Sequence, residues 1–338
     1  MTMQTERSIT IEDVALAAGV SRAAVSKVIR DAYGVSPQMR TKVEAAIEKL
    51  DYRPRAAARA MRGSSYTLGV EIPTIPNHFF SKIIDGATTA LVDTRYQLII
   101  APADPNHDEG PQAIEALADR QVDGIVAISS KVPQEWLEKL ATRVPLVMIG
   151  RHHQSVHYDT LVGDDIVGAG LAVQHLFDLG HRRIVHLTLD EGTVAPGTPH
   201  AMREIGYLLS MTGLGLPPEI VKVKPHPGAT LEAARGLLSH LDGPVGIFAG
   251  HDELALEVLQ AVAERGLTAA QASVVGYDDT DVAAHALMSL TSINQSGTQM
   301  GAIAVRLLLE RINGRTESVH EVLTPKVMAR RSSTAPHS

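Results

Sequence analysis

Apolar residues recur at helical spacing along the first fifty residues. The stretch TIEDVALAAGVS places Thr10 before an apolar series and Asp13 three residues later, a capping-box pattern that begins a helix. Gly19 can take the positive φ that ends such a helix, and Ser21 can cap a second helix directly afterwards. Two short helices joined through a glycine turn indicate a helix-turn-helix.

A third helix is predicted after this pair. Ser36 and Pro37 form an N-cap followed by a first-turn proline, and the apolar spacing continues beyond them. The pattern therefore predicts a small three-helix unit within residues 1–53. Pro54 then interrupts the chain, and the alanine-rich linker 54–65 favours a helix with few groups to bury, so this helix would be marginal alone.

From Tyr66 onward, short apolar runs alternate with helical patterns, among them residues 80–92 and 110–120. Repeated strand and helix units predict the α/β class, with doubly wound parallel sheets that carry helices on both faces. The remaining length suffices for two such sheets, and ligands bind beyond the carboxyl ends of their strands. The apolar runs are YTLGVEIP, YQLIIAPA, VDGIVAIS, VPLVMIG, RRIVHLTL, VGIFAG and ASVVGYDD.

The net charge of −7 is divided unevenly along the chain of 338 residues. Residues 1–65 hold 11 Lys and Arg against 7 Asp and Glu, whereas the rest of the chain holds 20 against 31. A basic front can meet an anionic polymer, while an acidic remainder favours solubility. The charge pattern thus assigns the two parts of the chain different tasks.

The second predicted helix presents basic side chains on its outer faces. Arg22, Ala23, Ser26, Lys27 and Arg30 lie outside its apolar stripe. In a DNA major groove, Arg22 or Lys27 can donate to guanine O6 and N7, and Ala23 can touch a thymine methyl. Ser26 can reach a phosphate or a base edge. A solvated surface helix is the alternative, but the preceding turn and the third helix favour DNA binding.

Three stretches in this order resemble the LacI/GalR family of bacterial transcriptional regulators: TIEDVALAAGVSRAAVSKVI, VSPQMRTKVEAAIEKLDYRPRAAARAMRG and LGVEIP. The resemblance continues to the C-terminus. It implies a ligand-responsive repressor, not an enzyme, that binds a palindromic operator as a homodimer. It also implies a small-molecule effector, a sugar or sugar derivative, in a cleft between two lobes.

The resemblance further implies that residues 54–65 form a hinge helix, which folds on operator DNA and wedges an apolar side chain into the minor groove. The matching residue is Met61, a more flexible wedge. Ala24 and Lys27 depart from the family's usual threonine and arginine. The ammonium group of a lysine does not reproduce the two parallel hydrogen bonds that an arginine guanidinium can donate to one base. The expected DNA-binding residues are Thr10, Ser21, Arg22, Ala23, Ser26, Lys27, Arg30, Arg55, Ala58 and Met61.

For residues 66–338 the resemblance implies an effector-binding and dimerisation core with the two-lobed fold of periplasmic sugar-binding proteins. The chain is then expected to cross between the lobes near residues 163–165, 292–294 and 323–325. Lobe one would comprise about 66–164 and 294–323, and lobe two about 165–292 and 324–334.

The effector residues are carried over from the family by position. Arg203 stands three residues before a glycine in MREIGY, Asp278 follows the SVVG strand, and Gln295 follows LTSIN. A buried arginine and aspartate opposed across a cleft suit polyhydroxyl ligands, because charge-assisted hydrogen bonds discriminate hydroxyl positions. The alternative is that Arg203 and Asp278 are ordinary surface or helix-cap residues without a ligand. The expected set is Asn77, Phe80, Arg151, Arg203, His251, Asp252, Asp278 and Gln295, with His251 standing where the family usually has asparagine.

Other chemistry lacks a signature. The stretch RHHQSVH gathers His152, His153 and His157 without a carboxylate or cysteine at ligand spacing, so we expect a loop and no metal site. No dinucleotide fingerprint, P-loop lysine motif or nucleophile elbow is present, and we expect no cofactor. A sugar-binding receptor without a regulatory role, and an enzyme built on the same two-lobed fold, remain the alternatives.

Cellular location follows from what the chain lacks. It has no cysteine, which excludes a disulfide framework and a cysteine nucleophile. Its first residues show no basic and apolar leader, and no run approaches eighteen apolar residues. We therefore expect a cytoplasmic protein that does not contact the membrane.

Overall fold

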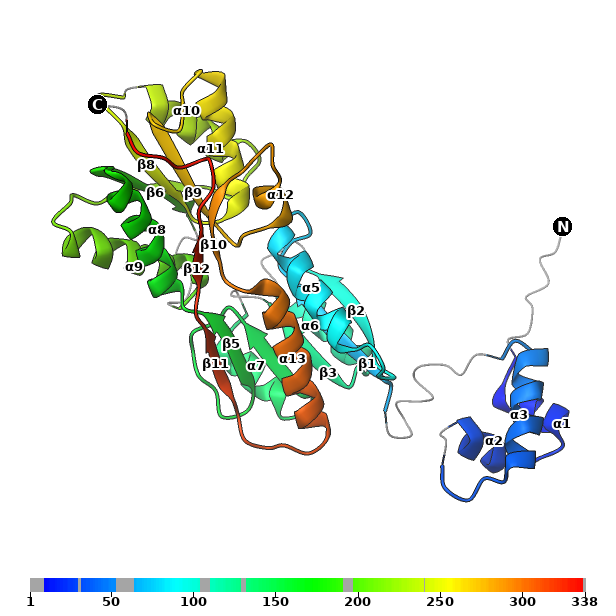
Figure 1. Cartoon of the computed structure of the whole chain (residues 1–338). Helices are drawn as coiled ribbons and strands as arrows, with labels where there is room; N and C mark the ends of the chain where they lie inside the picture. The colour runs from blue at the N-terminus through cyan, green and yellow to red at the C-terminus, as the bar shows by residue number, and fades with distance from the viewer. Residues whose placement is uncertain are drawn as a thin grey trace, which may run out of the picture. The chain divides into compact units, whose positions relative to one another are not determined.

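The computed structural model describes residues 9–29, 32–52, 64–103, 110–128, 132–190, 197–239 and 241–336. Its contacts divide the chain into two units, Met1–Ser65 and Tyr66–Ser338. Both units are drawn in Figure 1. No helix in the described part of the chain has the length and apolarity to cross a membrane.

The first unit is a bundle of the helices α1 (Ile11–Ala18), α2 (Arg22–Ile29) and α3 (Pro37–Lys49). The capping box that begins α1 is present: the Thr10 amide donates to Asp13 Oδ2 at 2.8 Å, and the Asp13 amide donates to Thr10 Oγ1 at 3.4 Å. Gly19 ends α1 with a φ of 66°. The predicted helix-turn-helix is therefore confirmed. Its core is formed by Val14, Ala15, Val25, Val28, Val43 and Ala46.

The second unit is built on two six-stranded sheets, with the orders β11-β5-β4-β3-β1-β2 and β12-β10-β9-β8-β6-β7. The first sheet is parallel throughout, and in the second sheet β12 alone pairs antiparallel. The predicted α/β class is confirmed. The strands of the first sheet are β1 (Thr67–Ile72), β2 (Gln97–Pro102), β3 (Gly124–Ala127), β4 (Leu146–Ile149), β5 (Asp159–Gly163) and β11 (His320–Leu323). Those of the second are β6 (Arg183–Leu189), β7 (Glu219–Val223), β8 (Val245–Ala249), β9 (Ala272–Tyr277), β10 (Thr291–Asn294) and β12 (Lys326–Met328).

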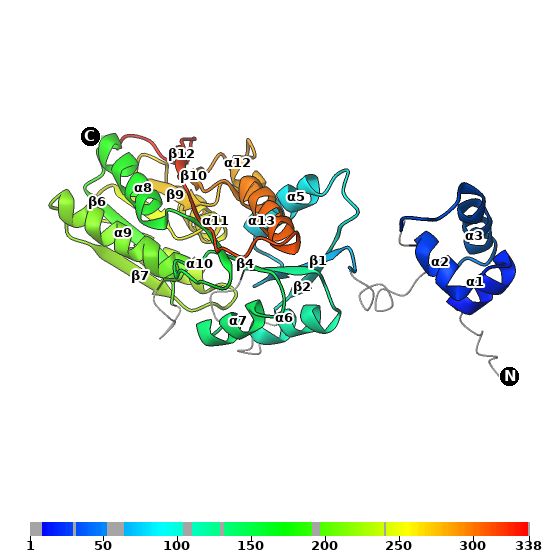
Figure 2. The same ribbon diagram turned by 90° about the horizontal axis from the view of Figure 1, so that it is seen from below.

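Helices cover both faces of each sheet (Figures 1 and 2). In the first sheet Val126 faces α5 and α13, whereas its neighbours Ile125 and Ala127 face α6 and α7, as the alternation of a strand requires. The second sheet is covered by α10 and α11 on one face and by α8 and α9 on the other. The helices are α5 (His78–Ala90), α6 (Gly110–Asp119), α7 (Gln134–Ala141), α8 (Asp165–Leu179), α9 (Pro199–Gly213), α10 (Ala229–Ser239), α11 (Asp252–Glu264), α12 (Asp281–Ala284) and α13 (Gly297–Ile312).

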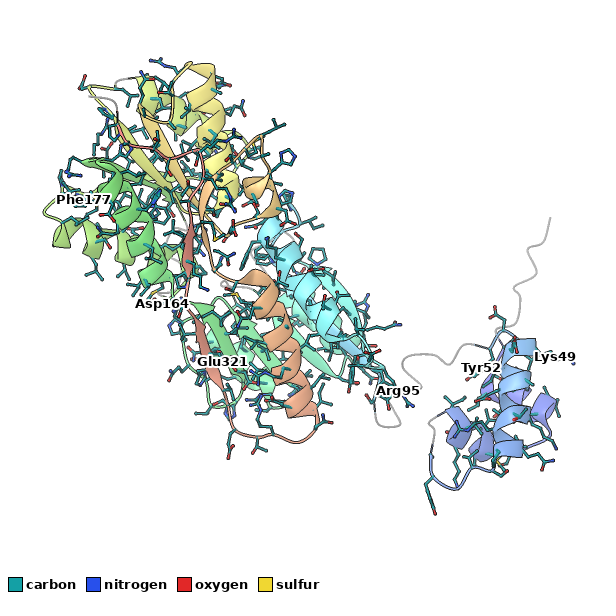
Figure 3. All side chains as sticks on the ribbon, viewed as in Figure 1. Lys49, Tyr52, Arg95, Asp164, Phe177 and Glu321 are labelled. Carbon is teal, nitrogen blue, oxygen red and sulfur yellow. The ribbon has the colours of Figure 1, made fainter. Side chains whose placement is uncertain are left out.

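We call the first sheet with α5, α6, α7 and α13 lobe one, and the second sheet with α8 to α12 lobe two. The chain passes from β5 to α8 through Asp164, which lies at the junction of the lobes (Figure 3). It returns from β10 to α13, and crosses again between β11 and β12. Because Asn294 still pairs with Lys326 in the second sheet, the second crossing falls at residues 295–296, later than 292–294.

Helices α5 and α13 approach each other at backbone distance. A Cβ added at Gly86 would lie 1.8 Å from the Thr298 carbonyl oxygen, and one at Gly301 would lie 1.9 Å from that of Ile83. Only glycine therefore permits this contact at the two positions. The contact joins the segment after the second crossing to the first helix of lobe one.

The strand pattern in the sequence was incomplete. Strands β5, β7, β10, β11 and β12 are additional to the seven apolar runs. Strands β7, β11 and β12 lie at sheet edges and are partly exposed, so they lack a continuous apolar signal. In β5 the fully buried Asp159 interrupts the apolar pattern. Its burial is possible because it pairs with Arg311 at 2.9 Å and Arg315 at 2.7 Å.

Candidate functional sites

The outer face of α2 carries the predicted base-reading residues. Ser21 caps the helix by accepting a hydrogen bond from the Ala24 amide at 3.1 Å. Arg22, Ala23 and Lys27 are exposed, and Ser26 is half-buried. Arg22 Nη1 lies 3.3 Å from Glu12 Oε1, and both side chains are more than half exposed. Such a surface pair is worth at most about 1 kcal/mol, so Arg22 can leave it for DNA.

Four predicted DNA contacts lie outside the described residues: Arg30, Arg55, Ala58 and Met61. Their roles stay predictions. The described DNA candidates all come from the start of α1 and from α2 with its cap.

Arg203, on α9, is almost fully buried in lobe two. Its Nε donates to Asp165 Oδ1 at 2.8 Å, and its Nη1 donates to the Gly250 carbonyl at 2.7 Å. The guanidinium carbon lies 3.7 Å from the ring centroid of Tyr277, a cation-π contact. Burial alone would lower the pKa of Arg203, but the negative charges of Asp165 and Asp278 help to raise it above its usual range. The arginine is therefore held charged and in one orientation.

Asp278 follows β9 and is 2 % exposed. Its Oδ1 accepts a hydrogen bond from Gln295 Nε2, whereas its Oδ2 has no hydrogen-bond partner among the described residues. Burial raises the pKa of Asp278 well above its ordinary value, although the charge of Arg203 acts in the opposite direction. Its backbone φ is 113°, a value that residues other than glycine rarely adopt. An acceptor held in this way suits a ligand that donates hydrogen bonds.

The structure corrects one expectation about this pair. Arg203 and Asp278 do not oppose each other across the cleft, because α9 and β9 both belong to lobe two. Gln295, at the second crossing, is the candidate that connects them to lobe one. Both residues also lie within 165–292, the range expected for lobe two, so the lobe boundaries by themselves place the pair on one side of the cleft.

Asp252 is the first residue of α11 and has no exposed surface. Its Oδ2 accepts hydrogen bonds from the amide and hydroxyl of Thr280 at 2.8 and 2.9 Å, and its Oδ1 accepts from Ser292 Oγ at 2.6 Å. Burial raises the pKa of Asp252 to about 6. Both oxygens are thus engaged within lobe two, and contact with an effector stays a prediction for this residue.

His251 precedes α11 and caps it, with Nδ1 accepting from the Leu254 amide at 3.4 Å. The same nitrogen lies 3.0 Å from Glu253 Oε2. From lobe one, the His78 amide donates to Glu253 Oε1 at 2.9 Å. Lys82 Nζ on α5 also reaches Asp281 Oδ1 of lobe two at 3.0 Å. His251 therefore lies beside a direct contact between the lobes, which the sequence did not predict.

Glu253 should stabilise the core at neutral pH, and this contribution should be lost in acid. Burial alone would raise its pKa, but the nearby His251 and the hydrogen bond from the His78 amide lower the pKa to about 2. A lowered pKa gives stability that is complete above the ordinary value of about 4.5 and is lost as the pH falls towards 2. Replacing Glu253 by Gln should therefore cost about 3 kcal/mol at neutral pH and little at pH 2, as measured by urea unfolding. The exposed Glu317→Gln is the control, and equal losses at both pH values would contradict the assignment.

The remaining candidates come from lobe one. Asn77 Oδ1 accepts from the Phe79 amide at 2.8 Å and caps α5, which consequently begins at His78 and not at Phe80. Phe80 packs against the core of lobe one. Arg151 was expected among the effector residues, but its side chain is buried and Nη1 donates to the Val132 carbonyl of the same lobe. Burial lowers the pKa of Arg151.

Two residues outside the expected effector set, Asp165 and His152, are linked to Arg203. Asp165, at the start of α8, binds Arg203 through Oδ1, and its Oδ2 lies 2.8 Å from His152 Nε2 of lobe one. The His152 amide also donates to the Gly197 carbonyl of lobe two at 3.3 Å. The repeated aspartate in VGDD is the signal for this position in the sequence: Asp164 caps α8, and Asp165 reaches Arg203.

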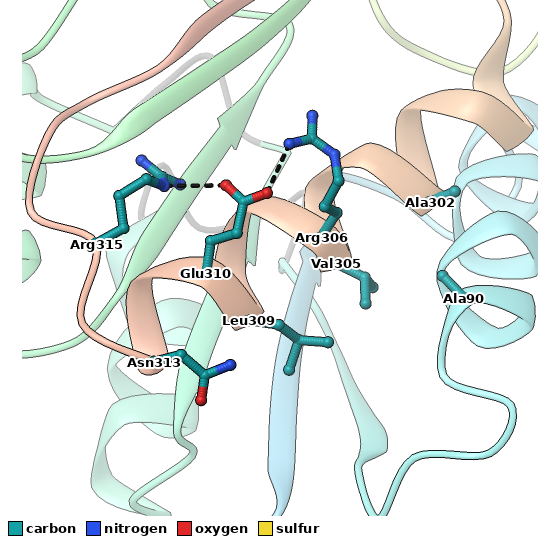
Figure 4. A pocket seen from close by; sticks show the side chains of 8 residues that line it. All are labelled: Ala90, Ala302, Val305, Arg306, Leu309, Glu310, Asn313 and Arg315. Atoms are coloured by element: carbon teal, nitrogen blue, oxygen red, sulfur yellow. Dashed lines mark hydrogen bonds and ion pairs between the residues drawn. The ribbon is translucent and has the colours of Figure 1, made fainter.

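A groove of about 600 Å³ lies elsewhere, between the end of α5 and the second half of α13 (Figure 4). Its charged side chains are paired with one another: Glu310 binds Arg306 at 2.8 Å and Arg315 at 3.0 Å. None of the predicted effector residues lines this groove. We assign it no ligand.

Comparison with known proteins agrees with this architecture. Residues 10–55 match the family model described as bacterial regulatory proteins, lacI family, and residues 173–334 match that of a periplasmic binding protein-like domain. The chain is similar to the lac repressor dimer bound to operator and the anti-inducer ONPF, with a TM-score of 0.81 and 25 % identity over 97 % of this chain and 100 % of that one.

Curated relatives extend over the same length. The catabolite control protein A of Priestia megaterium is 33 % identical over 97 % of this chain and 99 % of its own. The ribose operon repressor of Escherichia coli (strain K12) is also 33 % identical, over 96 % of this chain and 99 % of its own. Since both units are covered together at this identity, the chain belongs to the LacI family of bacterial regulatory proteins.

Proposed function

We propose that this DNA-binding transcriptional regulator is a homodimeric repressor that binds an imperfect palindromic operator and responds to a sugar or sugar-derived effector held between its lobes. The observation that supports the effector site most directly is Asp278, whose buried Oδ2 has no partner among the described residues. Arg203, positioned by Asp165 and Tyr277, supplies donors beside it. Donor and acceptor together suit hydroxyl groups.

The operator proposal rests on the exposed face of α2. Two symmetry-related copies of this helix in a dimer read two half-sites, so an imperfect palindrome is expected. A relative solved as a dimer on its operator supports this arrangement. Selection of bound sequences from a random DNA library by the full chain tests it, and enrichment of a single, unrepeated half-site would contradict the dimer.

Effector chemistry is tested by a thermal-shift screen of the full chain with mono- and oligosaccharides, nucleosides and sugar phosphates. D-ribose is an evident first probe, since one relative is named a ribose operon repressor. A ligand at 100 times its Kd stabilises the folded state by about 2.7 kcal/mol. A ligand that shifts melting but never changes operator affinity would favour the alternative of a receptor without a regulatory role. A ligand that is turned over would favour an enzyme.

Arg22→Ala should weaken operator binding by about 1 to 3 kcal/mol and relax the preference at one base position, because a bidentate contact to guanine would be lost. Fluorescence anisotropy on the selected operator and on single-base variants measures both effects. Glu12→Ala is the matched control, since it removes the ion-pair partner of Arg22 and leaves the arginine in place. An equal loss on random DNA would instead assign Arg22 to phosphate contact.

A further inference from the structure

Three polar side chains form a continuous series of contacts where the two lobes meet. His152 Nε2 of lobe one lies 2.8 Å from Asp165 Oδ2, and Asp165 Oδ1 accepts from Arg203 Nε at 2.8 Å. Asp165 is 1 % exposed and Arg203 is 4 % exposed. The Asp165 carboxylate is therefore shared between lobe one and the arginine of the effector site.

This series compensates the charge of Arg203 before any ligand arrives. Two of its nitrogens are engaged, Nε by Asp165 and Nη1 by the Gly250 carbonyl, and its face lies on Tyr277. A second carboxylate, that of Asp278, is close enough to raise the pKa of Arg203. One buried cation is thus surrounded by two acidic side chains.

Such surroundings treat a neutral ligand and an anionic ligand differently. A hydroxyl group can accept from Arg203 and donate to Asp278 Oδ2, which needs a donor. A carboxylate or phosphate group would instead bring its own negative charge beside the acidic side chains of Asp165 and Asp278, where burial keeps like-charge repulsion strong. It would also compete with Asp165, which already neutralises the guanidinium.

We propose that Asp165 is a specificity-determining residue of the effector site: by neutralising Arg203, it makes this side of the cleft accept an uncharged, hydroxyl-bearing part of the effector and reject carboxylate and phosphate groups. The inference rests on the effector site proposed above and names the ligand chemistry that this site selects. Asp165 acts through Arg203, whose guanidinium it also holds in position.

Inorganic phosphate is the probe, titrated against the full chain in thermal melting and calorimetry. The wild type should show no saturable phosphate binding that depends on Arg203. Asp165→Asn should gain saturable binding, because the side chain keeps its size while Arg203 loses the negative charge that is bonded directly to it. The double variant Asp165→Asn with Arg203→Gln should lose this gain, which separates the cleft from phosphate bound at the basic first unit.

His152→Gln is the matched control. It removes the other partner of Asp165 but leaves the pair with Arg203 intact, so it should gain no phosphate binding. Asp165→Ser provides a second uncharged variant, read in the same way, if circular dichroism shows that Asp165→Asn does not fold. A gain that appeared equally in His152→Gln would point to loosened packing and overturn the proposal.

Two further results would overturn it: Arg203-dependent phosphate binding by the wild type, or no gain in a folded Asp165 variant. The proposed function fails differently, through absent operator binding or through a neutral effector that leaves operator affinity unchanged. A folded Asp165→Asn variant that binds both phosphate and operator would support the two proposals separately.

Discussion

Replacement of Asp278 by Ala should reduce effector affinity at least about 100-fold while operator affinity stays within about twofold of the wild type. The substitution removes the acceptor that has no other described partner and also leaves the Gln295 amide without its acceptor. Both groups are buried, so water replaces neither interaction fully. The base-reading residues belong to the other unit and are unaffected.

Calorimetry with the effector identified by the thermal-shift screen measures the first effect, and anisotropy on operator DNA measures the second. Asp278→Asn should lose less affinity than the alanine variant, because its amide oxygen can still accept from Gln295. Asp242→Asn, an exposed carboxylate of lobe two, is the control. Retained effector affinity in Asp278→Ala would show that the ligand binds elsewhere.

Glu71→Gln should stabilise the core strongly at neutral and alkaline pH. Glu71 lies on β1 in the interior of the first sheet and has no exposed surface. Its Oε2 accepts from the Ile128 amide at 2.8 Å. Burial raises the pKa of Glu71 to about 8, more than this hydrogen bond lowers it.

The sign of the pH dependence follows from this raised pKa. Below the ordinary value of about 4.5 the carboxyl group is protonated in both the folded and the unfolded chain, and its full contribution to stability is present. As the pH rises towards 8, the unfolded chain releases its proton first, so the folded state loses up to about 5 kcal/mol. Glutamine keeps the acceptor for Ile128 and cannot ionise, so the variant should lack this loss.

Urea unfolding at pH 5, 7 and 8.5, followed through the fluorescence of Trp136, tests the prediction. This is the only tryptophan of the chain, and it packs against the core of lobe one, where Glu71 lies. The gap between the variant and the wild type should widen with pH. Glu115→Gln, an exposed change on α6, should leave the pH slope unchanged. Parallel curves for wild type and Glu71→Gln would contradict the raised pKa.

The DNA-binding unit could be predicted from the sequence because its signals are local. Thr10, Asp13 and Gly19 act on backbone groups within a few residues, and the capping box and the left-handed turn are present in the structure. The spacing of Val14, Val25 and Val43 likewise determines which helix faces meet, and so which face of α2 carries Arg22 and Lys27 outward. The central strands of both sheets were predictable for the same reason, since each is a short run of buried apolar residues.

Only the tertiary structure shows which partners the effector candidates bind within the protein. Arg203 and Asp278 share one lobe, Asp252 is engaged by Thr280 and Ser292, and Asp165 joins His152 to Arg203. The residues of each hydrogen-bonded pair are 13 to 40 positions apart, and their meeting depends on the strand order and on the crossings between lobes. The sequence by itself determined the helix-turn-helix, the α/β class and the family, because short-range spacing controls caps, turns and buried faces. The pairing of buried charges depends on the tertiary structure, because the folded sheets bring together side chains that are distant in the sequence. Electrostatic interaction depends on the distance between charges in space.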